Sequence, residues 1–276
     1  IYRGRIEALS GVWSFVEHST AEYIIMSDCD VATTIDYKPV LRQHIESGAD
    51  ITAVYANTFC KCSESIDGTV FNTNAEGRIT DVMINPEIIG ECKLSLNMYV
   101  IKKEFLRKIV KDSISRGITS FETAILQGKK DEIKIYGFEH TGYFSKIDSM
   151  DSYYKENMAL LNTENRANLF RNEMPIYTKI RDNGPVKYGV GSKTKNSLIA
   201  DGCIIDGTVE NSVLFRGVKV GKGAVVRNCI LMQDTVIGNN CDIEYVVTDK
   251  RAEITDGRSL TGSESYPLYV GKKAKI

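Results

Sequence analysis

Residues 220–243 read VGKGAVVRNCILMQDTVIGNNCDI, and the six-residue spacing of aliphatic side chains in this stretch decides the fold of the chain's last third. That spacing relates Leu231, Ile237 and Ile243, and also the pairs Val220 and Val226, Ile199 and Ile205, and Val270 and Ile276. A hexapeptide period is typical of a parallel β-helix, in which every six-residue rung places one aliphatic side chain in a central column. The sequence therefore predicts a β-helix from about Ile176, and the side chains expected to point inward are those of Ile199, Ile205, Val220, Val226, Leu231, Ile237 and Ile243.

Small or compact residues follow most of these aliphatic positions by four, where they would fit the tight inner corners of a β-helix: Cys203, Val209, Ala224, Thr235, Cys241 and Ala274. The register slips near Asn211 and over residues 248–266, where we expect rungs to carry loops. An ordinary β-sandwich is the alternative, but its strands would alternate with a period of two rather than six.

Length and charge narrow the functional classes. A chain of 276 residues can build two cores of ordinary domain size. The 35 basic and 36 acidic residues give a net charge of −1 without a basic stripe, so a nucleic-acid or membrane-surface partner has no electrostatic support. No apolar run approaches the length of a membrane span.

The cysteines point to a reducing compartment. Seven are scattered along the chain, and Cys60 and Cys62 are too close together to bridge comfortably. Free thiols and a cytoplasmic location are therefore expected, with Cys60 and Cys62 as loop thiols. A zinc site would need a second cluster of ligands, which the sequence lacks.

The first two thirds read as an α/β domain. Residues 22–27 form an apolar strand that runs into Asp28-Cys29-Asp30, a helix is expected from Pro39 to Ser47, and residues 50–56 form the next strand. This strand–helix–strand order predicts a mostly parallel sheet. Ligands of such sheets bind outside the carboxyl ends of the strands, where Asp28 and Asp30 lie.

The chain opens inside a helical pattern at residues 6–16, so we expect that residues preceding Ile1 are missing from this sequence. Further along, a hairpin, strands and helices are expected at 69–73, 78–84, 94–101, 103–115, 120–127, 133–138, 141–145 and 149–161. A linker at 172–192 leads into the β-helix, which places the domains at 1–175 and 176–276.

Six segments, in this order, resemble motifs of the bacterial ADP-glucose pyrophosphorylase (glucose-1-phosphate adenylyltransferase) family, and the resemblance spans nearly the whole chain. They are Tyr2–Ala8 (Tyr-x-Gly-Thr-Ala-Asp-Ala), Asp30–Tyr37, Glu76–Pro86 (ending in Glu-Lys-Pro), Ser95–Val100, Tyr153–Asn157 and Met174–Thr178. The resemblance implies an α/β nucleotidyltransferase-like domain with a Rossmann-like mixed sheet, incomplete at its N-terminus, followed by a left-handed parallel β-helix.

The departures from the family fall on charged positions. Asp30 matches the first of two aspartates that hold Mg²⁺, but Lys146 stands where the second is expected, and a cation there would repel the metal. Asn85 replaces the lysine that would neutralise the sugar phosphate. Asp148 could substitute as a metal ligand, although its place just before a helix favours an N-cap. Asp36 is expected to cap a helix rather than bind a ligand.

This pattern resembles GlgD-type regulatory subunits. It implies a non-catalytic or weakly catalytic subunit of glycogen synthesis, with Mg²⁺ binding weakened or lost. The resemblance also implies that the protein assembles with a catalytic homologue into a hetero-oligomer, expected to be a tetramer. Self-association is the alternative. A small-molecule effector or a sugar nucleotide would be the ligand. The apolar segment Tyr266-Pro267-Leu268-Tyr269 lies outside the six-residue register and is a candidate partner contact.

Three alternatives stay open. A catalytically active adenylyltransferase would need metal ligands that replace the lost carboxylate. A hexapeptide acyltransferase would need a histidine base in the β-helix, and no histidine follows His140. A purely structural scaffold would bind no ligand.

Overall fold

A computed structural model describes residues 2–60 and 68–276 of the chain. The chain divides into two compact units, residues 1–142 and 143–276. The division falls earlier in the chain than the predicted boundary after residue 175, because the helices that follow residue 149 pack on the β-helix.

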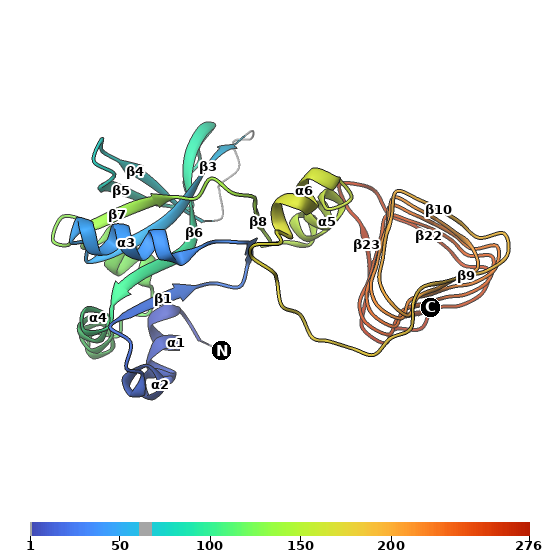
Figure 1. Ribbon diagram of the computed structural model, residues 1–276, viewed down its shortest axis with the longest axis horizontal. Coiled ribbons are helices and arrows are strands. Elements are labelled where there is room, and N and C mark those ends of the chain that lie inside the picture. The colour runs from blue at the N-terminus through green and yellow to red at the C-terminus, as the bar shows by residue number, and fades with distance from the viewer. Residues whose placement is uncertain (1, 61–67) are drawn as a thin grey trace. The chain divides into compact units, whose positions relative to one another are not determined.

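The first unit is built on a mixed sheet with the strand order β5-β4-β6-β3-β7, to which β1 adds by pairing with β6 (Figure 1). Its strands are β1 (Tyr23–Ser27), β3 (Ile51–Cys60), β4 (Thr69–Thr73), β5 (Ile79–Ile84), β6 (Gly90–Lys102) and β7 (Ile135–Glu139), and the short β2 (Val31–Thr33) follows β1.

The prediction of a mostly parallel sheet is wrong. Among the described strands of this sheet, β3 and β7 form the only parallel pair, whereas β6 runs antiparallel to β1, β3 and β4. The first two predicted strands, β1 and β3, are therefore not neighbours, because β6 lies between them. A strand that is buried on both faces has a continuous apolar sequence whether it is parallel or antiparallel to its neighbours. The sequence pattern therefore could not predict that β6 is antiparallel.

Helices α1 (Arg5–Gly11), α2 (Trp13–His18), α3 (Tyr37–Ser47) and α4 (Lys103–Ser115), with the π-helix η1 (Glu122–Gln127), accompany the sheet. Asp36 caps α3 as predicted, since its carboxylate accepts a hydrogen bond from the Lys38 backbone N–H at 2.9 Å. Gly48 ends α3 in the left-handed conformation, with φ of 59°. The core gathers Ile6, Ile51, Phe71, Tyr99, Ile101, Leu106, Phe121 and Ile135.

The second unit contains a left-handed parallel β-helix of hexapeptide repeats, seen in Figure 1 as stacked three-sided coils. Three parallel sheets of five short strands form its sides, ordered β10-β13-β16-β19-β22, β11-β14-β17-β20-β23 and β21-β18-β15-β12-β9. The strands are β9 (Lys187–Tyr188), β10 (Lys193–Lys195), β11 (Leu198–Ile199), β12 (Ile204–Ile205), β13 (Thr208–Glu210), β14 (Val213–Leu214), β15 (Lys219–Val220), β16 (Val225–Arg227), β17 (Ile230–Leu231), β18 (Val236–Ile237), β19 (Asp242–Glu244), β20 (Val246–Thr248), β21 (Glu253–Ile254), β22 (Ser259–Thr261) and β23 (Leu268–Val270).

The six-residue spacing is confirmed as the inward column of this β-helix. The side chains of Ile205, Val220, Val226, Leu231, Ile237 and Ile243 are buried in one apolar cluster. Ile199 packs against the same cluster but is only partly buried, because its strand belongs to the first coil. One corner column adopts the left-handed conformation in successive coils, at Asn196, Asn211, Asn228 and Tyr245. Asparagine tolerates that conformation well.

Helices α5 (Met150–Ala159) and α6 (Thr163–Leu169) follow the short strand β8 (Phe144–Lys146). Buried Tyr154 of α5 packs on outward-facing Val213, Ile230 and Val247, which come from three successive coils. Its phenol donates a hydrogen bond to the Asn228 backbone oxygen at 2.8 Å. This contact makes the helices part of the β-helix unit. No helix in the described ranges 2–60 and 68–276 combines the length and the apolar character needed to cross a membrane.

Candidate functional site

The carboxyl end of β1 carries an ion cluster that the sequence did not predict. The Arg5 guanidinium contacts the Asp28 carboxylate at 2.6 Å and the Glu122 carboxylate at 3.1 Å, and it lies 4.9 Å from the centre of the Tyr99 ring. Burial on its own would lower the pKa of Arg5, but Tyr99, Glu122 and Asp28 raise it overall. Arg5 is thus a fixed, permanently charged group whose side chain is only 13% exposed.

The Asp28 carboxylate is used within the chain. It neutralises the Arg5 guanidinium at 2.6 Å, although its own side chain is 40% exposed. Asp30 itself lies between β1 and β2, at the strand end where the sequence placed it. The signal for Arg5 was present in the sequence, because Arg5 stands at the threonine of the Tyr-x-Gly-Thr-Ala-Asp-Ala motif.

Asn85 follows β5 and has its amide engaged within the chain. Its Oδ1 accepts a hydrogen bond from the Gly68 backbone N–H at 2.9 Å, and its own N–H donates to the Gly68 oxygen at 2.8 Å. The φ of Asn85 is 48°, a left-handed conformation that asparagine adopts more readily than lysine. The residue closes the ends of β4 and β5, which gives it a structural reason to be asparagine.

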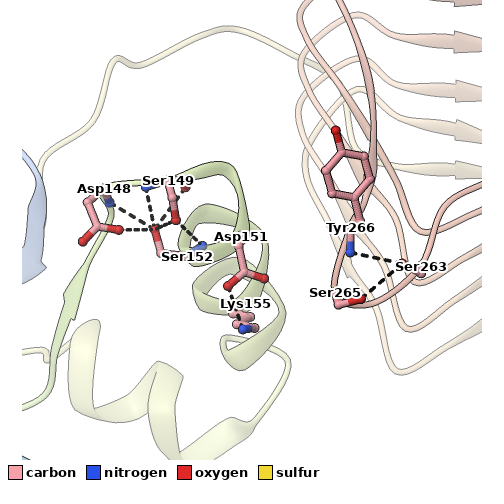
Figure 2. A network of polar contacts seen from close by, with 8 residues as sticks. All are labelled: Asp148, Ser149, Asp151, Ser152, Lys155, Ser263, Ser265 and Tyr266. Atoms are coloured by element: carbon pink, nitrogen blue, oxygen red, sulfur yellow. Dashed lines mark hydrogen bonds and ion pairs between the residues drawn. The ribbon is translucent and has the colours of Figure 1, made fainter. Parts of the chain in front are cut away.

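Lys146 and Asp148 are brought together at the entry to α5. The Lys146 ammonium lies 3.7 Å from the Asp148 carboxylate, and the Lys146 side chain is largely buried. Asp148 also accepts a hydrogen bond from the Ser152 hydroxyl at 3.1 Å and donates its backbone N–H to the same oxygen at 3.0 Å. Figure 2 shows the hydrogen bonds between Asp148 and Ser152 at the first turn of the helix.

The predicted N-cap role of Asp148 needs a correction. Ser149 caps α5, since its hydroxyl accepts a hydrogen bond from the Ser152 N–H at 3.0 Å and the two serines form a capping box. Asp148 precedes the cap and supports it through Ser152. A serine is as good a cap as an aspartate, so the sequence alone could not choose between neighbours.

The candidate residues thus fall into two sets. Asp30 and Asn85 belong to the first unit, and Lys146 and Asp148 form an ion pair in the second. Within the described part of the chain, no group of three or more His, Cys, Asp or Glu side chains is arranged to hold a metal ion. Cys29, Cys92, Cys203, Cys229 and Cys241 are free thiols, whereas the predicted loop thiols Cys60 and Cys62 lie outside the described side chains.

The apolar segment at the end of the β-helix is accessible in its unit. Tyr266 is 80% exposed and Tyr269 is 48% exposed, while Pro267 is buried. Leu268 and Tyr269 belong to β23, and Tyr269 extends the outer face of its sheet beside Val247.

A mixed-sheet α/β unit joined in one chain to a hexapeptide β-helix defines the class of nucleotidyltransferase-like proteins with a hexapeptide-repeat domain. The family model described as "GlmU-like, C-terminal hexapeptide" matches residues 186–264. The glycogen biosynthesis protein GlgD of Bacillus subtilis (strain 168) is 31% identical over 269 residues, covering 98% of this chain and 68% of that protein.

Other relatives are named for an enzyme. The glucose-1-phosphate adenylyltransferase of Clostridium perfringens (strain 13 / Type A) is 28% identical over 292 residues, covering all of this chain and 72% of that protein. The one of Bacillus anthracis is 29% identical over 264 residues, covering 93% of this chain and 68% of that protein. The chain belongs to the ADP-glucose pyrophosphorylase family, as a relative of GlgD.

Proposed function

We propose that the protein is a regulatory subunit of glucose-1-phosphate adenylyltransferase in glycogen biosynthesis, non-catalytic or weakly catalytic by itself. The observation that carries this proposal is the Lys146–Asp148 ion pair. Lys146 stands at a position where the family places a metal-binding carboxylate, and Asp148, the candidate replacement, is already partnered by that lysine.

The residues present fit Mg²⁺ poorly. A divalent cation prefers carboxylate and water oxygens, and it would have to displace or outweigh the Lys146 ammonium to use Asp148. Asp30 alone keeps the family's metal-binding residue type. We therefore propose that Mg²⁺ binding is weakened or lost, and we assign no reaction step to it.

The binding of an anionic substrate is weakened in the same way. Asn85 supplies no charge to a sugar phosphate, and its amide oxygen is engaged with the Gly68 backbone. Each lost preorganised electrostatic contact typically lowers a rate by about 10²–10³-fold. Two such losses would leave little turnover from this protein alone.

The proposed subunit acts through a partner. It would assemble in the cytoplasm with a catalytic homologue, as a hetero-oligomer such as a tetramer, and alter that enzyme's rate or its response to a small-molecule effector. The names of its relatives support this assignment, since GlgD-named and adenylyltransferase-named proteins both match along most of the chain.

The test is an assay of ADP-glucose synthesis from ATP and glucose 1-phosphate with Mg²⁺. The full-length protein alone should be essentially inactive, and adding it to the catalytic homologue should change kcat or the effector response. Size-exclusion chromatography after co-expression should show one complex. Turnover on the order of 10 s⁻¹ from the protein alone, or separate elution with unchanged kinetics, would refute the proposal.

An active adenylyltransferase is the second candidate, favoured by the enzyme names of its 28–29% identical relatives. In that case Asp148 would have to bind the metal, and Asp148→Asn would abolish the activity. A hexapeptide acyltransferase has less support, because residues 143–276 contain no histidine to serve as a base.

A further inference from the structure

A pocket of about 460 Å³ opens at the last coil of the β-helix, beside the start of α5. The outward row of the sheet β11-β14-β17-β20-β23 includes Val213, Ile230 and Val247, which Tyr154 covers. Tyr269 continues this row on β23, next to Val247. Tyr269 is 48% exposed and forms one wall of the pocket, together with Met150 and Asp151 at the start of α5.

An inserted loop supplies the opposite wall. Residues 262–267 interrupt the hexapeptide register between β22 and β23, and Ser263 and Tyr266 exchange backbone hydrogen bonds of 3.1 Å in both directions. Tyr266 is 80% exposed on this loop, where Figure 2 shows it with Ser263 and Ser265. Functional residues commonly lie on loops that a rigid scaffold positions, and here the scaffold is the β-helix.

The residues that line the pocket carry almost no net charge, although two further carboxylates, Asp249 and Glu264, lie close by. Of the residues that line it, Asp151 is the only carboxylate, and its Oδ2 is paired with the Lys155 ammonium at 2.6 Å. None of the lining residues is a lysine or an arginine, so a phosphate would meet no cation on the pocket wall. A cationic ligand would find a carboxylate whose charge is already offset.

Aromatic faces and hydroxyl groups remain as the recognition chemistry. The Tyr269 phenol donates a hydrogen bond to the Asp249 carboxylate at 3.2 Å, which fixes the orientation of its ring. Ser265 contributes a hydroxyl beside Tyr266. The partially positive C–H groups of a sugar ring pack well on the negative face of an aromatic ring. Sugar hydroxyls would donate to Asp151 and exchange hydrogen bonds with Ser265.

We propose that this pocket binds a neutral carbohydrate, a chain of α-linked glucose units. The volume is ordinary for a small-ligand pocket and suits a few sugar rings rather than a polymer's full length. The choice of an α-glucan among carbohydrates rests on the proposed function in glycogen biosynthesis. The preference for a neutral carbohydrate is independent of that function and rests on the aromatic lining of the pocket, which carries almost no net charge.

The experiment is a calorimetric titration of the full-length protein with maltoheptaose. Saturable binding with a dissociation constant on the order of 1 mM is expected. Tyr266→Ala should weaken it about tenfold, and Tyr266→Phe should retain it because the ring face is kept. Tyr177→Ala is the matched control, since Tyr177 is 90% exposed but does not line the pocket, and it should bind like the wild type.

Absence of saturable binding, or equal binding by Tyr266→Ala, would overturn the proposal. A β-linked cello-oligosaccharide that binds as tightly would overturn the assignment to an α-glucan. If Tyr266→Ala abolishes association with the catalytic homologue and maltoheptaose does not bind, the pocket is a protein contact instead. If the protein binds maltoheptaose but its addition leaves the kinetics of the catalytic homologue unchanged, the pocket assignment is upheld and the proposed regulatory function is refuted.

Discussion

Replacing Ile237 by aspartate tests the inward column of the β-helix most directly. The Ile237 side chain is 1% exposed, and its strand pairs on one side with β15 and on the other with β21. Removing an isoleucine from such a packed site costs about 2–5 kcal/mol when the space is not refilled. The new carboxyl must also be neutral to stay buried.

The cost of that proton depends on pH. Protonating a carboxyl of ordinary pKa near 3.9 at pH 7 costs about 4 kcal/mol, because each pH unit contributes about 1.36 kcal/mol. Together the two effects reach about 6–9 kcal/mol, which is comparable to the whole free energy of unfolding of a typical domain. We therefore expect Ile237→Asp to lack a folded β-helix at pH 7.

Urea unfolding followed by circular dichroism, with limited proteolysis of residues 143–276, measures this loss. Val236→Asp is the matched control, since Val236 precedes Ile237 on the same strand and is 36% exposed. It should lose less than about 1 kcal/mol. Because burial raises the folded-state pKa of the introduced carboxyl, the destabilisation by Ile237→Asp should shrink as pH falls toward about 4. Equal losses in the two variants, or no pH dependence, would refute the inward assignment.

Three further changes test other parts of the structure. Tyr154→Phe removes the hydrogen bond to the Asn228 oxygen and should lower the unfolding free energy of the second unit by about 1 kcal/mol in denaturant titrations, with Tyr177→Phe as the control because Tyr177 is 90% exposed. Burial lowers the pKa of His44 below 6.5, although Asp50 partly offsets this, so the unfolded chain binds more protons below pH 6.5. The first unit should therefore lose stability as pH falls through that window, and His44→Gln should flatten the slope. Asn85→Ala loses the bond to the Gly68 N–H and places a less tolerant residue at φ 48°, so a loss of about 1–3 kcal/mol is expected; an unchanged midpoint would contradict the structural role of Asn85.

The β-helix could be predicted from sequence because its signal repeats along the chain. Each inward residue is specified within its own coil, so Val220, Val226 and Ile237 could be placed without knowledge of their partners. The cap of α3 at Asp36 was likewise predictable, since the capping bond spans two residues.

Contacts between distant residues leave no local signal in the sequence. The sequence places the helix with Tyr154 in the first domain, because its partner Asn228 is 74 positions away and nothing local marks that contact. The direction of β6 could not be predicted, because an apolar strand sequence is compatible with parallel and with antiparallel pairing. Arg5 and Asp28 are 23 residues apart, and only the departure of Arg5 from a threonine position hinted that the carboxylate would be used internally.

The packing of Tyr154 against residues of three coils has a consequence for how the β-helix unfolds. In a solenoid, stability is approximately a sum of terms for each repeat and its nearest neighbours, so coils can fray singly from the ends. Tyr154 shares one buried apolar cluster with Val213, Ile230 and Val247, and this adds a coupling beyond nearest neighbours to the inner coils. Those coils should open as one cooperative unit, with similar protection of their amides from hydrogen exchange, while the first coil exchanges sooner.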